Sequence, residues 1–283
     1  MGFARTIVRE KIIDQNAVHF PPVDEEVNYF GFADAELKPY IRDLIFEAAE
    51  NKTRLFLSHL TSTTHHPWSV PPSFKTEEYM GSVGPDNHRD MNDYLNTIRY
   101  SDEWLGEILK LIDEANIANS TLVVILGDHG HAFPEDGKSF GAYLNGHVSN
   151  FRVPIVFRHP HLPRIDISAN ATPLSILPTI LDLLVQTKSL DTRDSEIASS
   201  LIHEYQGQSL LRPFKGQENG RQLWNMGIIS TGGSMLSVAS AATPFRLVLP
   251  LRDGVQPRFT HLEQDPSENH PLEAWTMREL KDK

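Results

Sequence analysis

The sequence predicts an α/β fold with a mostly parallel sheet flanked by helices and a small strand-rich subdomain at the C-terminus. Three observations support this prediction. Apolar residues recur at helical spacing in three stretches, short apolar runs of strand length lie between them, and residues 221–283 hold further strand-like runs. We therefore divide the chain into an irregular N-terminal segment (1–33), an α/β core (34–220) and a C-terminal subdomain (221–283).

The first predicted helix begins near Asp34, a candidate N-cap, and Pro39 is compatible with its first turn. Residues 54–61, RLFLSHLT, follow as a run of strand length that leads directly into the polar segment THHPW. His59 lies inside this run, and we expect it to satisfy a hydrogen bond in the core.

A longer helix is predicted over residues 86–118, where one apolar stripe continues at helical spacing. TLVVIL (121–126) and VPIVF (153–157) are expected to be strands, the first of them an interior parallel strand covered on both faces. Residues 172–185 predict another helix that Pro178 should break or bend. Residues 186–220 are rich in polar residues and glycine, which is typical of a surface connection.

Composition restricts the class of function. The chain has 26 Lys and Arg against 37 Asp and Glu, a net charge of −11, which argues against nucleic acid or an anionic membrane as the main partner. The absence of cysteine excludes disulfides, thiolate metal sites and a cysteine nucleophile. No apolar run approaches the roughly 20 residues that span a bilayer, so the chain as given is expected to be soluble, with compartment and oligomeric state open.

The end of the predicted strand 121–126 carries the main candidate for chemistry. Asp128 and His129 offer a carboxylate oxygen and an imidazole nitrogen at adjacent positions, and Gly130 allows the backbone to leave the strand sharply. This pattern predicts half of a metal site. An Asx-turn with an incidental histidine is the alternative.

Four more residues could bind an anion. His65 and His66 follow the predicted strand 54–61, and one of them could reach an anionic oxygen, although a solvated loop histidine fits equally well. His147 and Arg152 could each contact a tetrahedral anion, although an arginine before a strand is more often an ion-pair partner. His131 is a candidate for a position behind the metal ligands.

Five segments together resemble the sulfatase family of the alkaline phosphatase superfamily. They are the helix and strand ending in VVILGDHG (residues 92–130 as a whole), THHPW, NFRVPIVFRHP, TPLSILPTILDLL, and the C-terminal segment from TPFRLVLP to DPSENHPL. Their order and spacing match the family over residues 34–271, which is far more specific than any single motif.

The resemblance implies roles for individual residues. Asp128 and His129 would be ligands of a divalent metal (Ca²⁺, Mn²⁺ or Mg²⁺, with Zn²⁺ also compatible), and His65 would contact the sulfate or phosphate group. His147 would be a second anion contact. The implied function is metal-dependent hydrolysis of sulfate esters. Because many arylsulfatases carry Asp-Asn where this chain has Asp-His, a phosphodiesterase or phosphotransferase of the same superfamily is the alternative.

The resemblance fails at the nucleophile. The 283 residues contain no Cys-, Ser- or Thr-x-Pro-x-Arg motif, which in this family supplies the attacking group. We therefore expect the chain to correspond to the C-terminal portion of such a hydrolase, without the nucleophile segment. A non-catalytic truncated relative with a weak metal or anion site is the remaining alternative.

Overall fold

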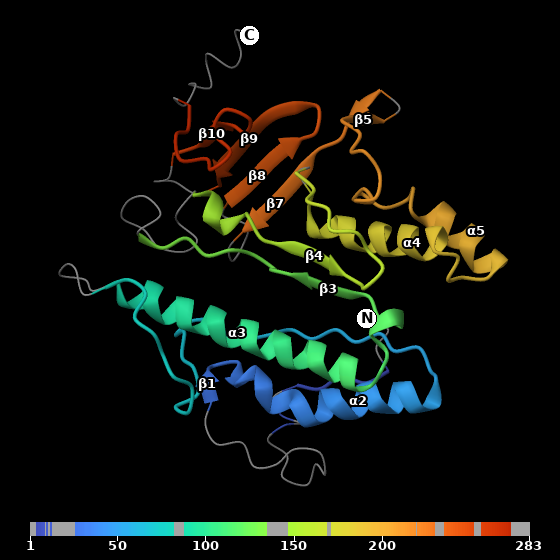
Figure 1. Cartoon of the computed structure of the whole chain (residues 1–283). Coiled ribbons are helices and arrows are strands. Elements are labelled where there is room, and N and C mark those ends of the chain that lie inside the picture. Colours follow the sequence, from blue (N-terminus) through green and yellow to red (C-terminus); the bar gives the residue numbers. More distant parts are fainter. Residues whose placement is uncertain are drawn as a thin grey trace. The chain divides into compact units, whose positions relative to one another are not determined.

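The structure is a computed structural model, and it describes residues 4–8, 10, 12, 26–81, 88–134, 147–168, 171–218, 220–229, 235–251 and 256–272. The chain forms two compact units (Figure 1). Unit 1 consists of Met1–Leu122 with His159–Leu162, and unit 2 of Val123–Arg158 with Pro163–Lys283. We describe each unit separately.

Unit 1 is built on two helices, as the apolar spacing predicts. A 3₁₀ turn, η1 (Asp34–Leu37), leads into α2 (Lys38–Asn51), with Pro39 in the first turn of α2. The long helix α3 (Arg89–Glu114) packs beside α2 (Figure 1) and is followed by the 3₁₀ turn η2 (Ala118–Ser120). Ile41, Ile45, Trp104 and Leu111 are buried on these helices. Their burial explains why the apolar stripes repeat with a helical period.

Residues 26–32, inside the segment expected to be irregular, form an antiparallel hairpin. Its strands are β1 (Glu26–Asn28) and β2 (Gly31–Phe32). Val27 and Ala33 are buried with Tyr100 of α3, so the hairpin contributes to the core of unit 1. Apolar periodicity cannot reveal such short strands, because each presents one or two side chains to the core.

The strand predicted over residues 54–61 is wrong. In the part of the chain that the structure describes, these residues belong to no strand, and Phe56 and Leu60 are 75% and 82% exposed. A strand requires a neighbouring backbone that pairs with it, and an apolar run cannot supply that neighbour. His59 is nevertheless partly buried, and its Nε2 accepts a hydrogen bond from Trp104 Nε1 at 3.0 Å, as expected.

In unit 2, β3 (Val123–Leu126) and β4 (Ile155–Arg158) confirm two predicted strands, but they pair antiparallel, with Leu126 opposite Ile155. The prediction of a parallel interior strand was therefore wrong for this pair, and both strands are half-buried. A parallel pair needs a long crossover, usually an α-helix, whereas the described residues between these strands contain no α-helix. The antiparallel pairing places the segment after β3 and the segment before β4 at the same end of the ladder.

Two further predictions for unit 2 need correction. The 3₁₀ turn η6 (Pro173–Ser175) runs into α4 (Ile176–Gln186), and Pro178 does not break α4, because it lies in the first turn, where no amide donor is needed. The expected surface connection contains α5 (Thr192–Leu201). Asp191 caps this helix by accepting the Asp194 amide hydrogen at 2.8 Å.

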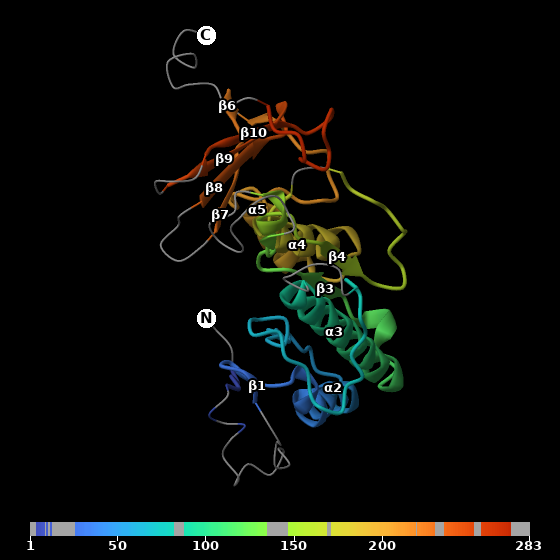
Figure 2. The ribbon, with the colours of Figure 1, turned by 90° about the vertical axis from the view of Figure 1, so that its left-hand side faces the viewer.

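The C-terminal part of unit 2 is rich in strands, as predicted. A small hairpin, β5 (Gln217–Glu218) with β6 (Arg221–Gln222), precedes four antiparallel strands in the order β10-β9-β8-β7 (Figure 2). These strands are β7 (Asn225–Ile229), β8 (Met235–Ser240), β9 (Thr243–Pro250) and β10 (Arg258–His261). Met235 and Val248 are buried in this sheet. The α/β class with a strand-rich C-terminal sheet is thus confirmed.

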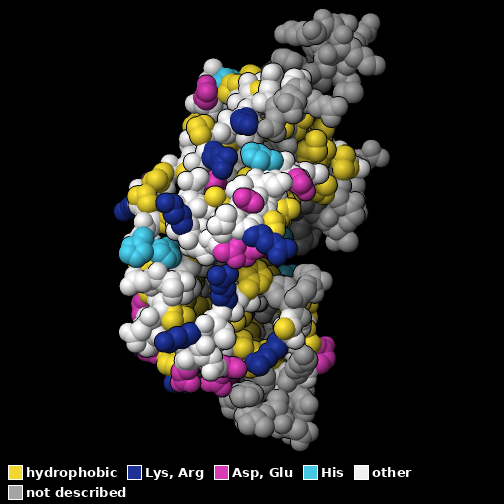
Figure 3. Space-filling view, turned by 90° about the vertical axis from the view of Figure 1, so that its right-hand side faces the viewer, with side chains coloured by type: hydrophobic (Ala, Val, Ile, Leu, Met, Phe, Trp, Pro, Cys, Tyr) yellow, Lys and Arg dark blue, Asp and Glu magenta, His cyan; other side chains and the backbone are white. Residues whose placement is uncertain are grey.

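The surface of the described residues is mixed in character. On the face in Figure 3, acidic and basic side chains lie intermixed, and neither sign forms a continuous field there. None of the helices among the described residues has both the length and the apolar composition needed to cross a membrane.

Candidate metal and anion site

Asp128 and His129 lie immediately after β3 and point toward each other. Asp128 Oδ1 accepts the His129 amide hydrogen at 2.9 Å, and the other carboxylate oxygen, Oδ2, lies 3.8 Å from His129 Nε2. Metal–oxygen and metal–nitrogen bonds are each about 2.0–2.2 Å long, so one cation can contact both atoms. The Asx-type contact and the metal-site geometry therefore coexist.

A hydrogen bond of the His129 ring fixes which of its two nitrogens carries the hydrogen in the neutral form. Nδ1 lies 2.7 Å from the Gly130 carbonyl oxygen, which can only accept, so Nδ1 carries the hydrogen. In the neutral ring Nε2 then holds the lone pair, on the side of Asp128. A second hydrogen bond that orients the imidazole in this way is typical of histidines that bind metals.

Asn150 holds the loop after β3 against the loop before β4. Its side-chain oxygen accepts the Ala132 amide hydrogen at 2.8 Å, and its carbonyl accepts the Gly130 amide hydrogen at 3.0 Å. Asn150 is buried, and it belongs to the 3₁₀ turn η5 (Val148–Asn150). Sequence reasoning missed Asn150, because only the antiparallel pairing of β3 and β4 brings these loops together.

His147 caps η5 with its imidazole. Nδ1 accepts the Ser149 amide hydrogen at 3.2 Å and lies 2.6 Å from Ser149 Oγ. Nδ1 is therefore unprotonated in the neutral ring, and the hydrogen resides on Nε2. This is the tautomer of a hydrogen-bond donor, suited to an anionic oxygen, and it is opposite to that of His129.

Two other predicted site residues in unit 2 have different surroundings. The His131 ring packs on Phe133, with centroids 4.6 Å apart. Arg152 Nη2 donates to the Pro266 carbonyl at 2.6 Å and to Glu268 Oε1 at 3.2 Å. Arg152 is thus an ion-pair partner, which is the alternative noted from its position before a strand.

His65 and His66 lie in unit 1. His65 Nδ1 is 2.9 Å from the His66 carbonyl oxygen and therefore donates to it, so Nε2 accepts from the Tyr29 hydroxyl at 3.2 Å. The rings of Tyr29 and Phe30 both meet His65 edge-on. The His66 ring packs instead on Trp68. Tyr29 comes from the β1–β2 hairpin, and the sequence offered no signal for it.

Asp34 supports the segment that precedes His65. Its carboxylate accepts the amide hydrogens of Ser62 at 2.8 Å and Thr63 at 3.1 Å, and it is buried. Asp34 is therefore not the helix N-cap that its position suggests, since Ala33 occupies that position without a side-chain cap. Its carboxylate instead fixes the backbone three residues before His65.

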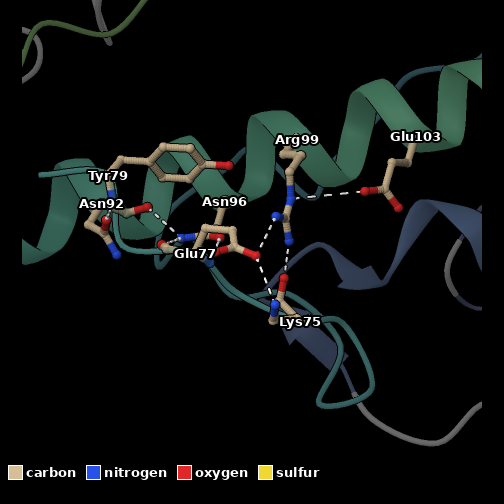
Figure 4. A network of polar contacts seen from close by, with 7 residues as sticks. All are labelled: Lys75, Glu77, Tyr79, Asn92, Asn96, Arg99 and Glu103. Atoms are coloured by element: carbon tan, nitrogen blue, oxygen red, sulfur yellow. Dashed lines mark hydrogen bonds and ion pairs between the residues drawn. The ribbon is translucent and has the colours of Figure 1, made fainter.

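A polar network also fixes the chain that follows Trp68 (Figure 4). The Asn96 side chain, on α3, accepts the Glu77 amide hydrogen at 2.8 Å and donates to the Glu77 carbonyl at 2.9 Å. Arg99, one turn further along α3, donates to the Lys75 carbonyl and lies 3.6 Å from the Glu77 carboxylate. The segment around Glu77 is thus attached to α3 at several points.

The donor set after β3 fits a divalent cation in part. Asp128 supplies a hard oxygen and His129 a nitrogen, a combination that suits Mg²⁺, Mn²⁺ or Zn²⁺. Within the described ranges, no group of three or more His, Asp or Glu residues is arranged to hold a metal. These two residues are therefore a partial ligand set.

The fold is that of the alkaline phosphatase superfamily. The chain superimposes on a superfamily member from Vibrio parahaemolyticus with a TM-score of 0.59 and 16% sequence identity, covering 93% of this chain and 54% of that chain. The sulfatase family model matches residues 4–186, more than half of the chain. The chain therefore belongs to the sulfatase family.

Two curated proteins show where the family similarity extends. Lipoteichoic acid synthase 1 of Bacillus subtilis (strain 168) is 25% identical over 166 residues, which covers 56% of this chain and 25% of that protein. N-acetylgalactosamine-6-sulfatase of Sus scrofa is 24% identical over 246 residues, which covers 74% of this chain and 45% of that protein. The chain thus spans less than half the length of each of these relatives.

Proposed function

We propose that this chain carries the metal- and anion-binding part of a hydrolase that cleaves sulfate esters, with a divalent cation held by Asp128 and His129. The observation that carries this proposal is the proximity of Asp128 Oδ2 and His129 Nε2, which lie 3.8 Å apart just after β3. Membership in the sulfatase family and the similarity to N-acetylgalactosamine-6-sulfatase support sulfate esters as the substrate class.

We propose a separate role for each of these side chains. Asp128 and His129 would hold a divalent cation, which when bound would supply positive charge to polarise an ester oxygen. His147, with its hydrogen on Nε2, donates to an oxygen of the anionic group and stabilises charge there. For His65, in unit 1, we propose the role of an anion contact that the family resemblance implies; its ring is held by hydrogen bonds with the Tyr29 hydroxyl and the His66 carbonyl. We assign the nucleophile to no residue of this chain.

Titration calorimetry with Mn²⁺, Ca²⁺ and Zn²⁺ tests the metal site. We expect wild type to bind at least one of these ions, and Asp128→Ala or His129→Ala to weaken binding by about 10–100-fold or more, because each removes one of few ligands. Asp166→Ala is the matched control, since Asp166 is an exposed loop carboxylate in the same unit. Equal affinities in all variants would contradict the assignment.

A phosphodiesterase or phosphotransferase is the second candidate. The Asp-His pair and the similarity to lipoteichoic acid synthase 1 favour it. Assays with 4-nitrophenyl sulfate and bis(4-nitrophenyl) phosphate separate the two candidates, and faster turnover of the sulfate supports the first. Turnover by these 283 residues alone would contradict the prediction that the nucleophile lies outside them.

A non-catalytic relative is the third candidate, favoured by the partial ligand set of the described residues. It predicts no heat with any of the three ions and no turnover of either ester. Binding of Mn²⁺ that depends on Asp128 would exclude a fully vestigial site.

A further inference from the structure

We propose that Glu268 is a positioning residue, which acts through Arg152 to hold the loops of the candidate site in place. This inference rests on the proposed function only for the role of those loops. Glu268 lies in the turn after β10, distant in sequence from both loops, and belongs to the same compact unit. Its carboxylate is buried, with the side chain 2% exposed.

Three arginines from three segments contact Glu268, two of them at its carboxylate and one at its backbone carbonyl. Arg152 Nη2 lies 3.2 Å and Arg246 Nε 3.1 Å from Glu268 Oε1, while Arg258 Nη2 donates to the Glu268 carbonyl. Arg246 belongs to β9, Arg258 to β10, and Arg152 to the segment that joins η5 to β4. Burial raises the pKa of the Glu268 carboxyl, and the guanidinium groups oppose that shift.

The backbone of Glu268 adopts a conformation that favours glycine over glutamate. Its φ is +53°, in the left-handed region that glycine occupies at little cost and other residues seldom adopt. A glutamate at such a position gives up some backbone stability, which an interaction of its buried carboxylate can offset. The ion pairs with Arg152 and Arg246 are that interaction.

Arg152 transmits the restraint to the site. Its amide donates to the Val148 carbonyl at 2.9 Å, and its side chain is bound by both Glu268 and the Pro266 carbonyl. The same 3₁₀ turn contains Asn150, which accepts the amide hydrogens of Gly130 and Ala132. A continuous series of contacts therefore runs from Glu268 to the loop that carries Asp128 and His129.

Asp182 provides a matched control. It is another buried carboxylate of unit 2, bound by both Arg212 Nε and Nη2 at 2.8 Å. It lies on α4 and contacts neither site loop through these bonds. Asp182→Asn therefore removes a comparable ion pair and reports the effect of destabilisation alone.

Hydrogen exchange of the folded 283-residue chain tests the proposal without a ligand. In Glu268→Gln and Arg152→Gln, we expect the amides of Gly130, Ala132 and position 152 to exchange at least about tenfold faster than in wild type. Amides of α4 should stay within about twofold of wild type. In Asp182→Asn, the amides of α4 should exchange faster, and those of the site loops should stay close to wild type. In the double variant Glu268→Gln/Arg152→Gln, these amides should exchange little faster than in either single variant, because both substitutions remove the same restraint.

Arg152→Gln decides the outcome if Glu268→Gln fails to fold, because Arg152 is half-exposed and Glu268 keeps its contact with Arg246. Unchanged exchange in the site loops of Arg152→Gln would overturn the proposal. Mn²⁺ titration is the second readout, with an expected loss of about tenfold in Arg152→Gln and less than about twofold in Asp182→Asn. If wild type binds none of Mn²⁺, Ca²⁺ and Zn²⁺, the proposed function alone is contradicted, and exchange still decides the role of Glu268.

Discussion

Gly130 approaches Ser149 so closely that a Cβ atom on Gly130 would lie 1.7 Å from the Ser149 carbonyl oxygen. Glycine is therefore required here by the approach of another backbone and not, as the sequence suggested, by a sharp exit from the strand. The approach joins the loop with Asp128 and His129 to the loop with His147.

Gly130→Ala should force these two loops apart. We expect a loss of about 3 kcal/mol in the free energy of unfolding, at the upper end for overpacking, because the obstacle is backbone and cannot rotate away. Mn²⁺ binding should weaken in parallel. Urea denaturation and calorimetry measure the two effects.

Gly106→Ala is the control for this substitution. Gly106 lies within α3, and a Cβ atom there meets nothing within 4 Å. The helix should become about 0.5–1 kcal/mol more stable, because alanine is the better helix former. A Gly130→Ala variant as stable as wild type would contradict the close approach.

Asp182→Asn should destabilise unit 2. Its carboxylate accepts hydrogen bonds from Arg212 and Ser209, and it is fully buried. Removing one partner of a buried ion pair costs about 3–5 kcal/mol; we expect about 2–3 kcal/mol here, since Arg212 is half-exposed. Denaturation by urea at pH 7 measures this loss.

The stabilisation by Asp182 should also depend on pH. Hydrogen bonds from Arg212 lower the pKa of Asp182, despite the opposing effect of burial. A lowered folded-state pKa means that the contribution is complete above the unfolded value of about 4 and is lost as the pH falls below it. The difference in unfolding free energy between wild type and Asp182→Asn should therefore become smaller as the pH falls from about 5 to 3. A constant difference would contradict this.

His59 should make unit 1 less stable in mild acid. Burial lowers the pKa of His59 against the attraction of Asp34, and its Nε2 already accepts the Trp104 indole hydrogen. The unfolded chain then takes up a proton, below about pH 6.5, that the folded chain resists, so stability falls as the pH falls.

His59→Gln tests this origin of the pH dependence. The glutamine amide can accept the Trp104 hydrogen but does not titrate, so unfolding free energy should fall less steeply between about pH 7 and pH 5. His203→Gln changes an exposed histidine and should keep the wild-type slope. Identical slopes in His59→Gln and wild type would show that His59 contributes nothing to the pH dependence.

Asp34→Ala should loosen the segment before His65. It leaves the amides of Ser62 and Thr63 without the carboxylate that accepts their hydrogens, at a cost of roughly 2–4 kcal/mol. Those two amides should also exchange faster with solvent. Asp43→Ala, at an exposed position of α2, should change stability by about 0.5 kcal/mol or less.

Periodicity in the sequence predicted α2, α3 and α4 because a helix that buries one face must repeat its apolar residues. Periodicity failed for residues 54–61, because that apolar run has no pairing strand among the described residues. It also failed for α5, because this helix is mostly polar and shows no apolar stripe; its N-cap is Asp191. The parallel sheet was wrong for β3 and β4, since strand direction depends on how the connecting chain returns.

The candidate site likewise contains some residues that the sequence indicates and others that only the structure reveals. Asp128 and His129 could be singled out as candidates because a carboxylate and an imidazole at adjacent positions follow a recognisable strand, and the family motifs around them have a specific order. Asn150, Tyr29 and Glu268 could not be predicted, because their roles depend on contacts between distant segments.

The sequence by itself determined the helices of the core, the family, and the adjacent carboxylate and imidazole after β3, since these depend on residues that are close along the chain. Only the tertiary structure decided the tautomers of His129 and His147, the antiparallel pairing that joins their loops, and the ion pair between Arg152 and Glu268. The physical reason is that hydrogen bonds and ion pairs are made in space. Arg152 and Glu268 are 116 residues apart in the chain, yet a guanidinium nitrogen and a carboxylate oxygen lie within 3.2 Å.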